Sequence, residues 1–140
     1  MRVVLVNLWH GGGEPEEVLG ADDLRRELAR ALARRGHEVA VVQEHPRRAA
    51  LDDGPVRWIF VPAGLIARAP RALLSAAGRD DAIVKAPAPH LYAPVATLRP
   101  DVIHSFDLAS YLYLWGLGRV ARRVGAALVA LDARVLHAGE

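Results

Sequence analysis

Short apolar runs alternate with amphipathic segments along this chain. Residues 2–8, 38–43, 56–61, 101–106 and 126–131 are rich in valine, isoleucine and leucine, and most of these runs show no alternation of apolar and polar positions. Uninterrupted runs of this length are typical of strands that are buried on both faces of a parallel sheet. The pattern therefore predicts about five β-strands.

Two longer segments have apolar residues at the three- and four-residue spacing of an amphipathic helix. The first, 21–35, has acidic residues in its first turn, arginines in its last turn and Gly36 directly after it, which together favour a helix that ends there. The second, 108–124, is followed by Gly125. Prolines interrupt 65–78 and 91–98, so shorter helices are predicted in these segments.

The segment 44–55 is predicted to be a surface loop, because Pro46 and the run Asp52-Asp53-Gly54-Pro55 are typical of turns. Elsewhere strands and helices alternate. We therefore predict an α/β fold: a doubly wound, mostly parallel, Rossmann-like sheet of about five strands with helices on both faces, forming one domain over residues 1–140. In such sheets ligands bind beyond the carboxyl ends of the strands, where the strand order reverses.

Composition removes several classes of function. The chain has 140 residues, 52% of them apolar, which is enough for one domain with a core, and it has no cysteine for a disulfide or a thiolate site. The high pI of about 9.5 reflects arginine rather than excess charge, since Lys85 is the only lysine and the formal net charge is +2. The arginines are dispersed among acids, so no nucleic-acid partner is expected. Without a leader or an apolar membrane span, the chain is expected to be cytoplasmic.

Three segments resemble the N-terminal domain of a GT-B glycosyltransferase. They are the opening strand with Gly11-Gly12-Gly13, the run from Glu27 to Val39, and the run from Arg99 to His104. The chain is similar in these places to the large retaining group that includes sucrose, glycogen and mannosyl transferases, the family 4-like enzymes. The resemblance covers almost the whole chain. It implies that the chain is a truncated acceptor-side lobe of a two-lobed enzyme. The C-terminal donor-binding lobe would be supplied in cis or as a separate subunit.

This resemblance also implies an activity. The enzyme would transfer a sugar from a nucleotide-sugar donor to an acceptor of unknown identity, with retention of anomeric configuration and no cofactor besides the donor substrate. Catalysis would rest on electrostatic stabilisation of the leaving diphosphate and of an oxocarbenium-like transition state. Because the main donor pocket belongs to the other lobe, the isolated chain is expected to have little or no activity.

Four glycines near the first predicted helix are the candidate donor-phosphate site. Gly11, Gly12 and Gly13 follow the first strand, and Gly20 stands where the first long helix is expected to begin. A glycine-rich turn lets backbone amides approach a phosphate. The segment Glu14–Glu17 between them is predicted to be an acidic loop, which opposes a phosphate, so a flexible turn without ligand is the alternative.

The remaining candidates follow the fourth and fifth strands. His104 and Asp107 are the candidate catalytic residues, because an imidazole at a strand end can donate to a sugar hydroxyl or a phosphate; a hydrogen-bonded core histidine is the alternative. Phe106, where the family often has a second histidine, joins Asp132 and Arg134 as the candidate acceptor site. The other histidines lack metal-ligand spacing, and no metal is expected.

Two further functions remain open. The chain is alternatively a non-catalytic binding or scaffolding module that keeps the fold and has lost sugar-facing residues, which Phe106 and Asp132 favour, or a small flavodoxin-like or regulatory domain. The basic, leucine-containing stretch 65–79 also suggests a weak peripheral contact with an anionic membrane surface, with ordinary packing as the alternative.

Overall fold

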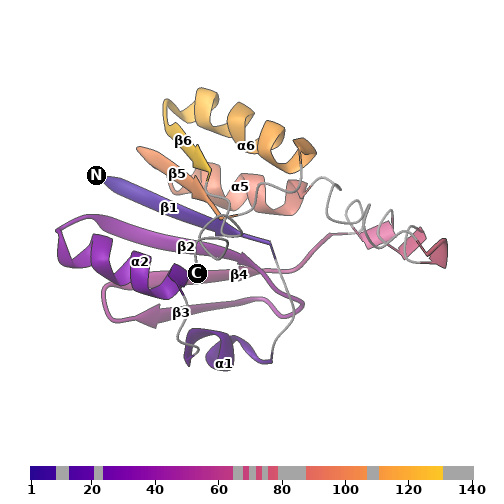
Figure 1. Ribbon diagram of the computed structural model, residues 1–140, viewed down its shortest axis with the longest axis horizontal. Helices are drawn as coiled ribbons and strands as arrows, with labels where there is room; N and C mark the ends of the chain where they lie inside the picture. Colours follow the sequence, from indigo (N-terminus) through magenta and orange to yellow (C-terminus); the bar gives the residue numbers. More distant parts are fainter. Residues whose placement is uncertain are drawn as a thin grey trace, which may run out of the picture.

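The computed structural model describes residues 1–8, 13–20, 24–64, 68–69, 72–73, 76–78, 88–106 and 111–130. These residues form an α/β fold around a six-stranded sheet (Figure 1). The strands are β1 (Arg2–Asn7), β2 (Glu38–Glu44), β3 (Ala49–Asp53), β4 (Val56–Val61), β5 (Val102–Ser105) and β6 (Ala127–Ala130). The prediction of an α/β fold with a mostly parallel sheet is confirmed, and the five predicted strands are β1, β2, β4, β5 and β6.

The sixth strand, β3, corrects the prediction of a surface loop over 44–55. β3 pairs with β4 in antiparallel register, with Asp53 opposite Val56, so that Gly54 and Pro55 form a tight turn. Gly54 has a φ of 59°, which a side chain would disfavour. The sequence Ala-Ala-Leu-Asp-Asp has low intrinsic strand propensity, so β3 exists because of its pairing with β4 and not because of a local preference.

The helices whose bounds lie within the described residues are α1 (Pro15–Gly20), α2 (Leu24–Arg34), α5 (Pro89–Thr97) and α6 (Tyr111–Val124). Both long helices end as predicted. At α2, Gly36 has a φ of 88°, and its amide and that of His37 bond back to the carbonyls of Ala33 (3.0 Å) and Leu32 (3.3 Å), which is a Schellman motif. Within the predicted broken helix over 65–78, the described residues 68–69, 72–73 and 76 are helical, and 77–78 form a turn.

Helix α1 corrects the prediction that the acidic segment Glu14–Glu17 is a loop. The helix starts at Pro15, whose fixed φ suits a first helical position, and Glu16 and Glu17 lie in its first turn, where the helix dipole favours negative charge. The same residues that suggested a polar loop therefore provide the start of a short helix.

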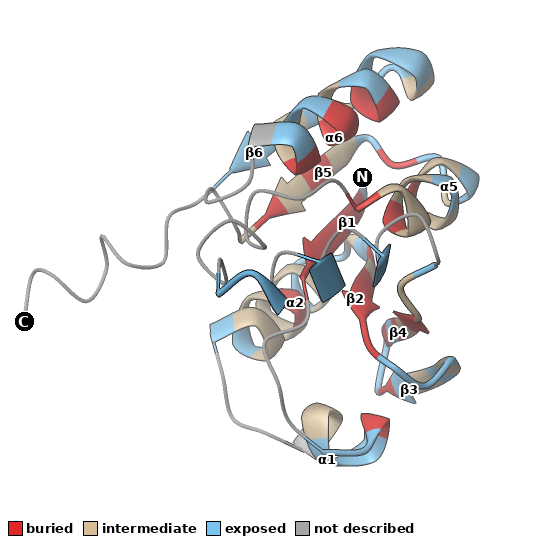
Figure 2. Ribbon diagram, turned by 90° about the vertical axis from the view of Figure 1, so that its right-hand side faces the viewer, coloured by how far each residue is buried: buried red, intermediate tan, exposed pale blue. Residues whose placement is uncertain are grey.

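Apolar side chains on the two faces of the sheet belong to two separate clusters. Successive residues of β1 alternate between them: Val4 and Val6 join one cluster, and Val3 and Leu5 join the other. The first cluster contains buried residues of α5 and α6, and the second contains Ala29 of α2 together with Trp58 and Phe60 of β4. The buried parts of β1, β2 and β4 lie between these helices in Figure 2.

Close packing of α5 against α6 depends on Gly116. A Cβ at this position would overlap the ring and hydroxyl of Tyr92 on α5. The Tyr92 hydroxyl donates to the carbonyl oxygens of Leu112 (3.3 Å) and Tyr113 (3.2 Å), so it contacts the backbone of α6 directly. None of the helices in the described part of the chain has the length and apolar character needed to span a bilayer.

The sheet order β3-β4-β2-β1-β5-β6 fixes where a ligand can bind. Numbered among themselves, the parallel strands follow the order 3-2-1-4-5, which is compatible with a Rossmann-like fold. The chain moves outward from β1 to β2 and β4 and then returns to the other side of β1 as β5. The order therefore reverses between β1 and β5, and the carboxyl ends of these strands mark the candidate site.

Candidate functional site

Two buried amides join the carboxyl ends of β1 and β2. Nδ2 of Asn7 donates to Oε1 of Gln43 at 3.1 Å, and Nε2 of Gln43 lies 3.4 Å from the carbonyl oxygens of both Leu8 and Glu44. Asn7 is 1% exposed, and its Oδ1 has no hydrogen-bond partner among the described residues. A buried acceptor without a donor is costly. Asn7 therefore holds a buried acceptor, unsatisfied within the described part of the chain, beside the point where the strand order reverses.

His104 lies on the same face of the sheet as Asn7, because Val102 and Phe106, two residues before and after it, pack on the same cluster as Val3 and Leu5. It is half-buried, and its ring centroid lies 4.6 Å from that of Phe106. Burial lowers the pKa of His104 below its ordinary 6.5, so the imidazole is neutral at pH 7. Its Nδ1 has no partner in the described part of the chain. This nitrogen is buried, and the described residues leave its hydrogen-bonding capacity unused.

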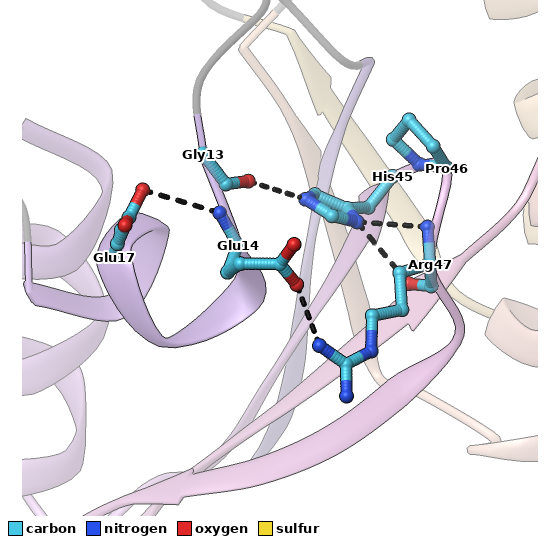
Figure 3. Close-up of a pocket in the computed structure, with 6 residues that line it drawn as sticks. All are labelled: Gly13, Glu14, Glu17, His45, Pro46 and Arg47. Atoms are coloured by element: carbon cyan, nitrogen blue, oxygen red, sulfur yellow. Dashed lines mark hydrogen bonds and ion pairs between the residues drawn. The ribbon is translucent and has the colours of Figure 1, made fainter.

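A shallow pocket lies beyond the end of β2 (Figure 3). It has a volume of about 560 Å³, and its lining residues are Gly13, Glu14, Glu17, His45, Pro46 and Arg47. His45 is 4% exposed; its Nε2 donates to the carbonyl of Gly13 at 2.8 Å, and its Nδ1 accepts from the amide of Arg47 at 2.9 Å. This pattern fits the neutral Nε2–H tautomer. His45 thus ties the segment before α1 to the end of β2.

Charged groups make the Gly13 side of this pocket acidic. Nη1 of Arg47 lies 2.6 Å from Oε2 of Glu14, and this hydrogen bond raises the pKa of Arg47. The Glu17 carboxylate accepts from the amide of Glu14 at 3.2 Å and occupies the space that a Cβ on Gly13 would need. Two carboxylates against one guanidinium favour an uncharged, hydroxyl-rich ligand at this position over a phosphate.

The opposite face of the sheet holds two buried polar pairs near the strand ends. Nε2 of His90, on the first turn of α5, lies 2.6 Å from Oε1 of Glu44, and their side chains are 7% and 6% exposed. The Ser105 hydroxyl donates to the Tyr113 hydroxyl at 3.3 Å. Sequence reasoning placed Glu44 at a strand end but did not predict its pairing with His90. The available signal was a carboxylate at the end of an otherwise apolar strand, which needs a partner when it is buried.

The predicted site residues divide by position. Gly11, Gly12, Asp107, Asp132 and Arg134 lie outside the described residues. His104 and Phe106 lie together at the end of β5, as predicted.

The predicted position of Gly20 needs correction. It is the last residue of α1 and does not stand at the start of a long helix, because the acidic segment before it is itself helical. A helix end presents carbonyl oxygens, which do not bind phosphate.

A second hollow lies at the other end of the strands. It has a volume of about 500 Å³ and is lined by Met1, Arg2, Gly36, Glu38, Arg99 and Asp101. Arg2 and Glu38 form an ion pair across it at 3.1 Å. Because this hollow opens at the amino ends of β1 and β2, it is not where α/β sheets bind their ligands. Among the described residues, no group of three histidine or carboxylate side chains is arranged to hold a metal ion.

Comparison with known proteins finds no protein-family model and no curated protein that matches this chain.

Proposed function

We propose that this chain is the N-terminal, acceptor-binding lobe of a GT-B retaining glycosyltransferase, which moves a sugar from a nucleotide-sugar donor and needs a C-terminal donor-binding lobe for activity. The observation that carries the proposal is the reversal of strand order between β1 and β5, with Asn7, His104 and Phe106 on one face of the sheet beside it. The type of reaction is inferred from the three segments that resemble this family.

Hydrogen-bonding groups of both kinds suit a sugar at this position. Oδ1 of Asn7 and Nδ1 of His104 are buried without partners among the described residues, and sugar hydroxyls would pair with them once a ligand displaces the groups that cover the strand ends. The ring of Phe106, in contact with His104, offers an apolar surface to the C–H face of a sugar ring. The acidic pocket around Gly13 and His45 tolerates further hydroxyls.

The remaining roles follow the resemblance. Backbone amides at Gly11 and Gly12 would approach the donor diphosphate, Asp107 would act with His104 at the reacting centre, and Asp132 and Arg134 would bind the acceptor. The sugar would leave the diphosphate through an oxocarbenium-like transition state, and fixed donors would stabilise the charge that develops on the leaving group. Most of these donors would belong to the second lobe, so the isolated chain transfers little or no sugar.

A non-catalytic binding module is the second candidate, and Phe106 favours it. An aromatic ring at the end of β5 binds an apolar surface but cannot move a proton. The two functions differ in one outcome: both bind a sugar at the carboxyl ends of the strands, but only the first gives transfer when a donor-binding lobe is added.

Chemical-shift mapping of the isotopically labelled chain tests the common premise. The probes are glucose, mannose, N-acetylglucosamine, UDP-glucose and GDP-mannose, each titrated to millimolar concentration. At least one probe should shift the amides of Asn7, Gln43 and Phe106 and leave those of Arg2, Glu38 and Asp101 at the opposite edge unchanged. Shifts confined to the opposite edge would refute the proposed site. Efficient sugar transfer by the chain alone would refute the need for a second lobe.

A further inference from the structure

The outward face of α6 combines exposed apolar and cationic side chains. Leu112 and Trp115 are 53% and 60% exposed, although large apolar residues are normally covered. Arg119, Arg122 and Arg123 are also exposed. Spacings of three, four and three residues from Leu112 to Arg122 place these side chains on one side of the helix. The helix lies at the rim of the molecule, where its outer side is open (Figures 1 and 2).

Trp115 and Arg119 form one unit within this face. The guanidinium carbon of Arg119 lies 5.0 Å from the centroid of the indole ring, within the range of a cation–π interaction. Helix α6 has no acidic residue, and Arg119, Arg122 and Arg123 have no acidic partner among the described residues. By contrast, Arg26 and Arg30 of α2 both bind Asp53. The charge on α6 is therefore available to an external anion.

We propose that this face of α6 docks on an anionic lipid surface. Leu112 and Trp115 would enter the headgroup boundary, where tryptophan is enriched because one part of its ring is apolar and its N–H is polar. The three arginines would contact lipid phosphates, and basic residues close to an anionic surface each strengthen binding. A helix that is apolar along part of one face and cationic along the rest has the composition of an interfacial helix.

The direction of α6 places its apolar end toward the carboxyl ends of the strands. The helix follows β5, so Leu112 and Trp115 lie toward the carboxyl ends of the strands, and Arg122 and Arg123 lie toward the amino ends. Helix α6 packs on the first cluster, so a lipid surface on its outer side would lie across the sheet from Asn7 and His104. The inference itself does not depend on sugar transfer, because it rests on exposure and charge alone.

Vesicle co-sedimentation tests this surface directly. The full chain is mixed with vesicles of 30% phosphatidylglycerol in phosphatidylcholine and, separately, with pure phosphatidylcholine. Binding to the anionic vesicles should be at least tenfold tighter and should weaken as salt is added. Replacing one arginine should weaken binding by about fivefold, and the triple variant Arg119→Gln, Arg122→Gln, Arg123→Gln by about 100-fold.

A matched control is available on α2. Arg34 is exposed in the last turn of its helix, as Arg122 is in α6, but it lies on the other side of the sheet. Arg34→Gln should leave vesicle binding unchanged. Tryptophan emission should shift to the blue on anionic vesicles, and this shift should disappear in Trp115→Phe. Circular dichroism checks that each variant is folded.

Three results would overturn the proposal that α6 docks on an anionic lipid surface. They are no binding to anionic vesicles, equal binding to both vesicle types, or an equal loss of vesicle affinity in Arg34→Gln and Arg122→Gln. A dimer in solution that disappears in Trp115→Ser would also overturn it, because the face would then be a contact between two copies of this chain. Each readout is obtained without sugar, so its failure is distinguishable from failure of the proposed function.

Discussion

Replacing Asp53 by asparagine tests how α2 is fixed to the β3–β4 hairpin. The Asp53 carboxylate lies at the end of β3, is 8% exposed, and binds Arg26 at 2.9 Å and Arg30 at 2.8 Å. Both guanidiniums reach it through two nitrogens. These hydrogen bonds lower the pKa of Asp53 from 3.8 to about 2. At 1.36 kcal/mol per pKa unit, ionised Asp53 contributes about 2 kcal/mol to the free energy of unfolding at neutral pH.

The sign of the pH dependence follows from the lowered pKa. The unfolded chain takes up the proton at a higher pH than the folded chain, so the contribution of Asp53 is complete above about pH 5 and is lost as the pH falls. It should drop to about 1.3 kcal/mol at pH 3 and about 0.4 kcal/mol at pH 2. The loss caused by Asp53→Asn should shrink in the same way.

Urea denaturation followed by circular dichroism measures this loss at pH 7, 4 and 3. Asp52→Asn is the matched control, because Asp52 is the exposed neighbour of Asp53 on the same strand, and it should change the free energy of unfolding by less than about 0.5 kcal/mol. Equal effects of the two substitutions at pH 7 would refute the reasoning. A loss in Asp53→Asn that did not diminish toward pH 3 would refute it as well.

Two further substitutions test packing and burial. Gly116→Ala should destabilise the chain by about 1–3 kcal/mol in urea denaturation, because the new Cβ overlaps Tyr92. In the control Gly118→Ala, the new Cβ would meet only Leu128 at 3.9 Å, so the loss should be less than about 0.5 kcal/mol. Equal losses of stability in the two variants would contradict this packing. Because burial lowers the pKa of His104, the unfolded chain takes up the proton first and stability falls as the pH drops below 6.5. His104→Gln should therefore lose less stability than the unchanged chain between pH 7.5 and 5.5, and an identical loss would contradict a buried, neutral His104.

Parallel strands and long helices could be predicted because their signals are local. A run such as 2–8 is apolar throughout because both of its faces are covered, and the end of α2 is specified by Gly36. These features depend on the residues of one segment, so sequence alone is sufficient. The same holds for the position of His104 at the end of β5, which follows from strand order along the chain.

Other parts of the fold depend on contacts between distant segments. β3 is held by its register with β4 and by the bonds from Asp53 to Arg26 and Arg30, residues more than 20 positions away in the sequence, and no local pattern shows this. Helix α1 had a local signal, proline at its start with acids in the first turn, which a loop prediction from polarity alone passes over.

The candidate site could be predicted only in part, because it too depends on contacts between residues far apart in the sequence. The Asn7–Gln43 amide pair joins the last residue of β1 to the second-last residue of β2, 36 positions away in the sequence. The Glu44–His90 pair joins the end of β2 to α5, with β3 and β4 between them along the chain. Which strand ends become neighbours depends on the order of strands in the sheet, and the residue pattern predicts only the class of fold and not that order.

Affinity for the strongest-binding sugar probe, measured by chemical-shift titration in three forms of the chain, tests the central claim most directly. His104→Ala removes a side chain at the proposed site, and Glu38→Gln removes a charge in the hollow at the opposite edge. His104→Ala should weaken binding by about tenfold or more, as expected for a lost hydrogen bond of about 1.4 kcal/mol, and Glu38→Gln should bind like the unchanged chain. Unchanged binding in His104→Ala together with weakened binding in Glu38→Gln would contradict it.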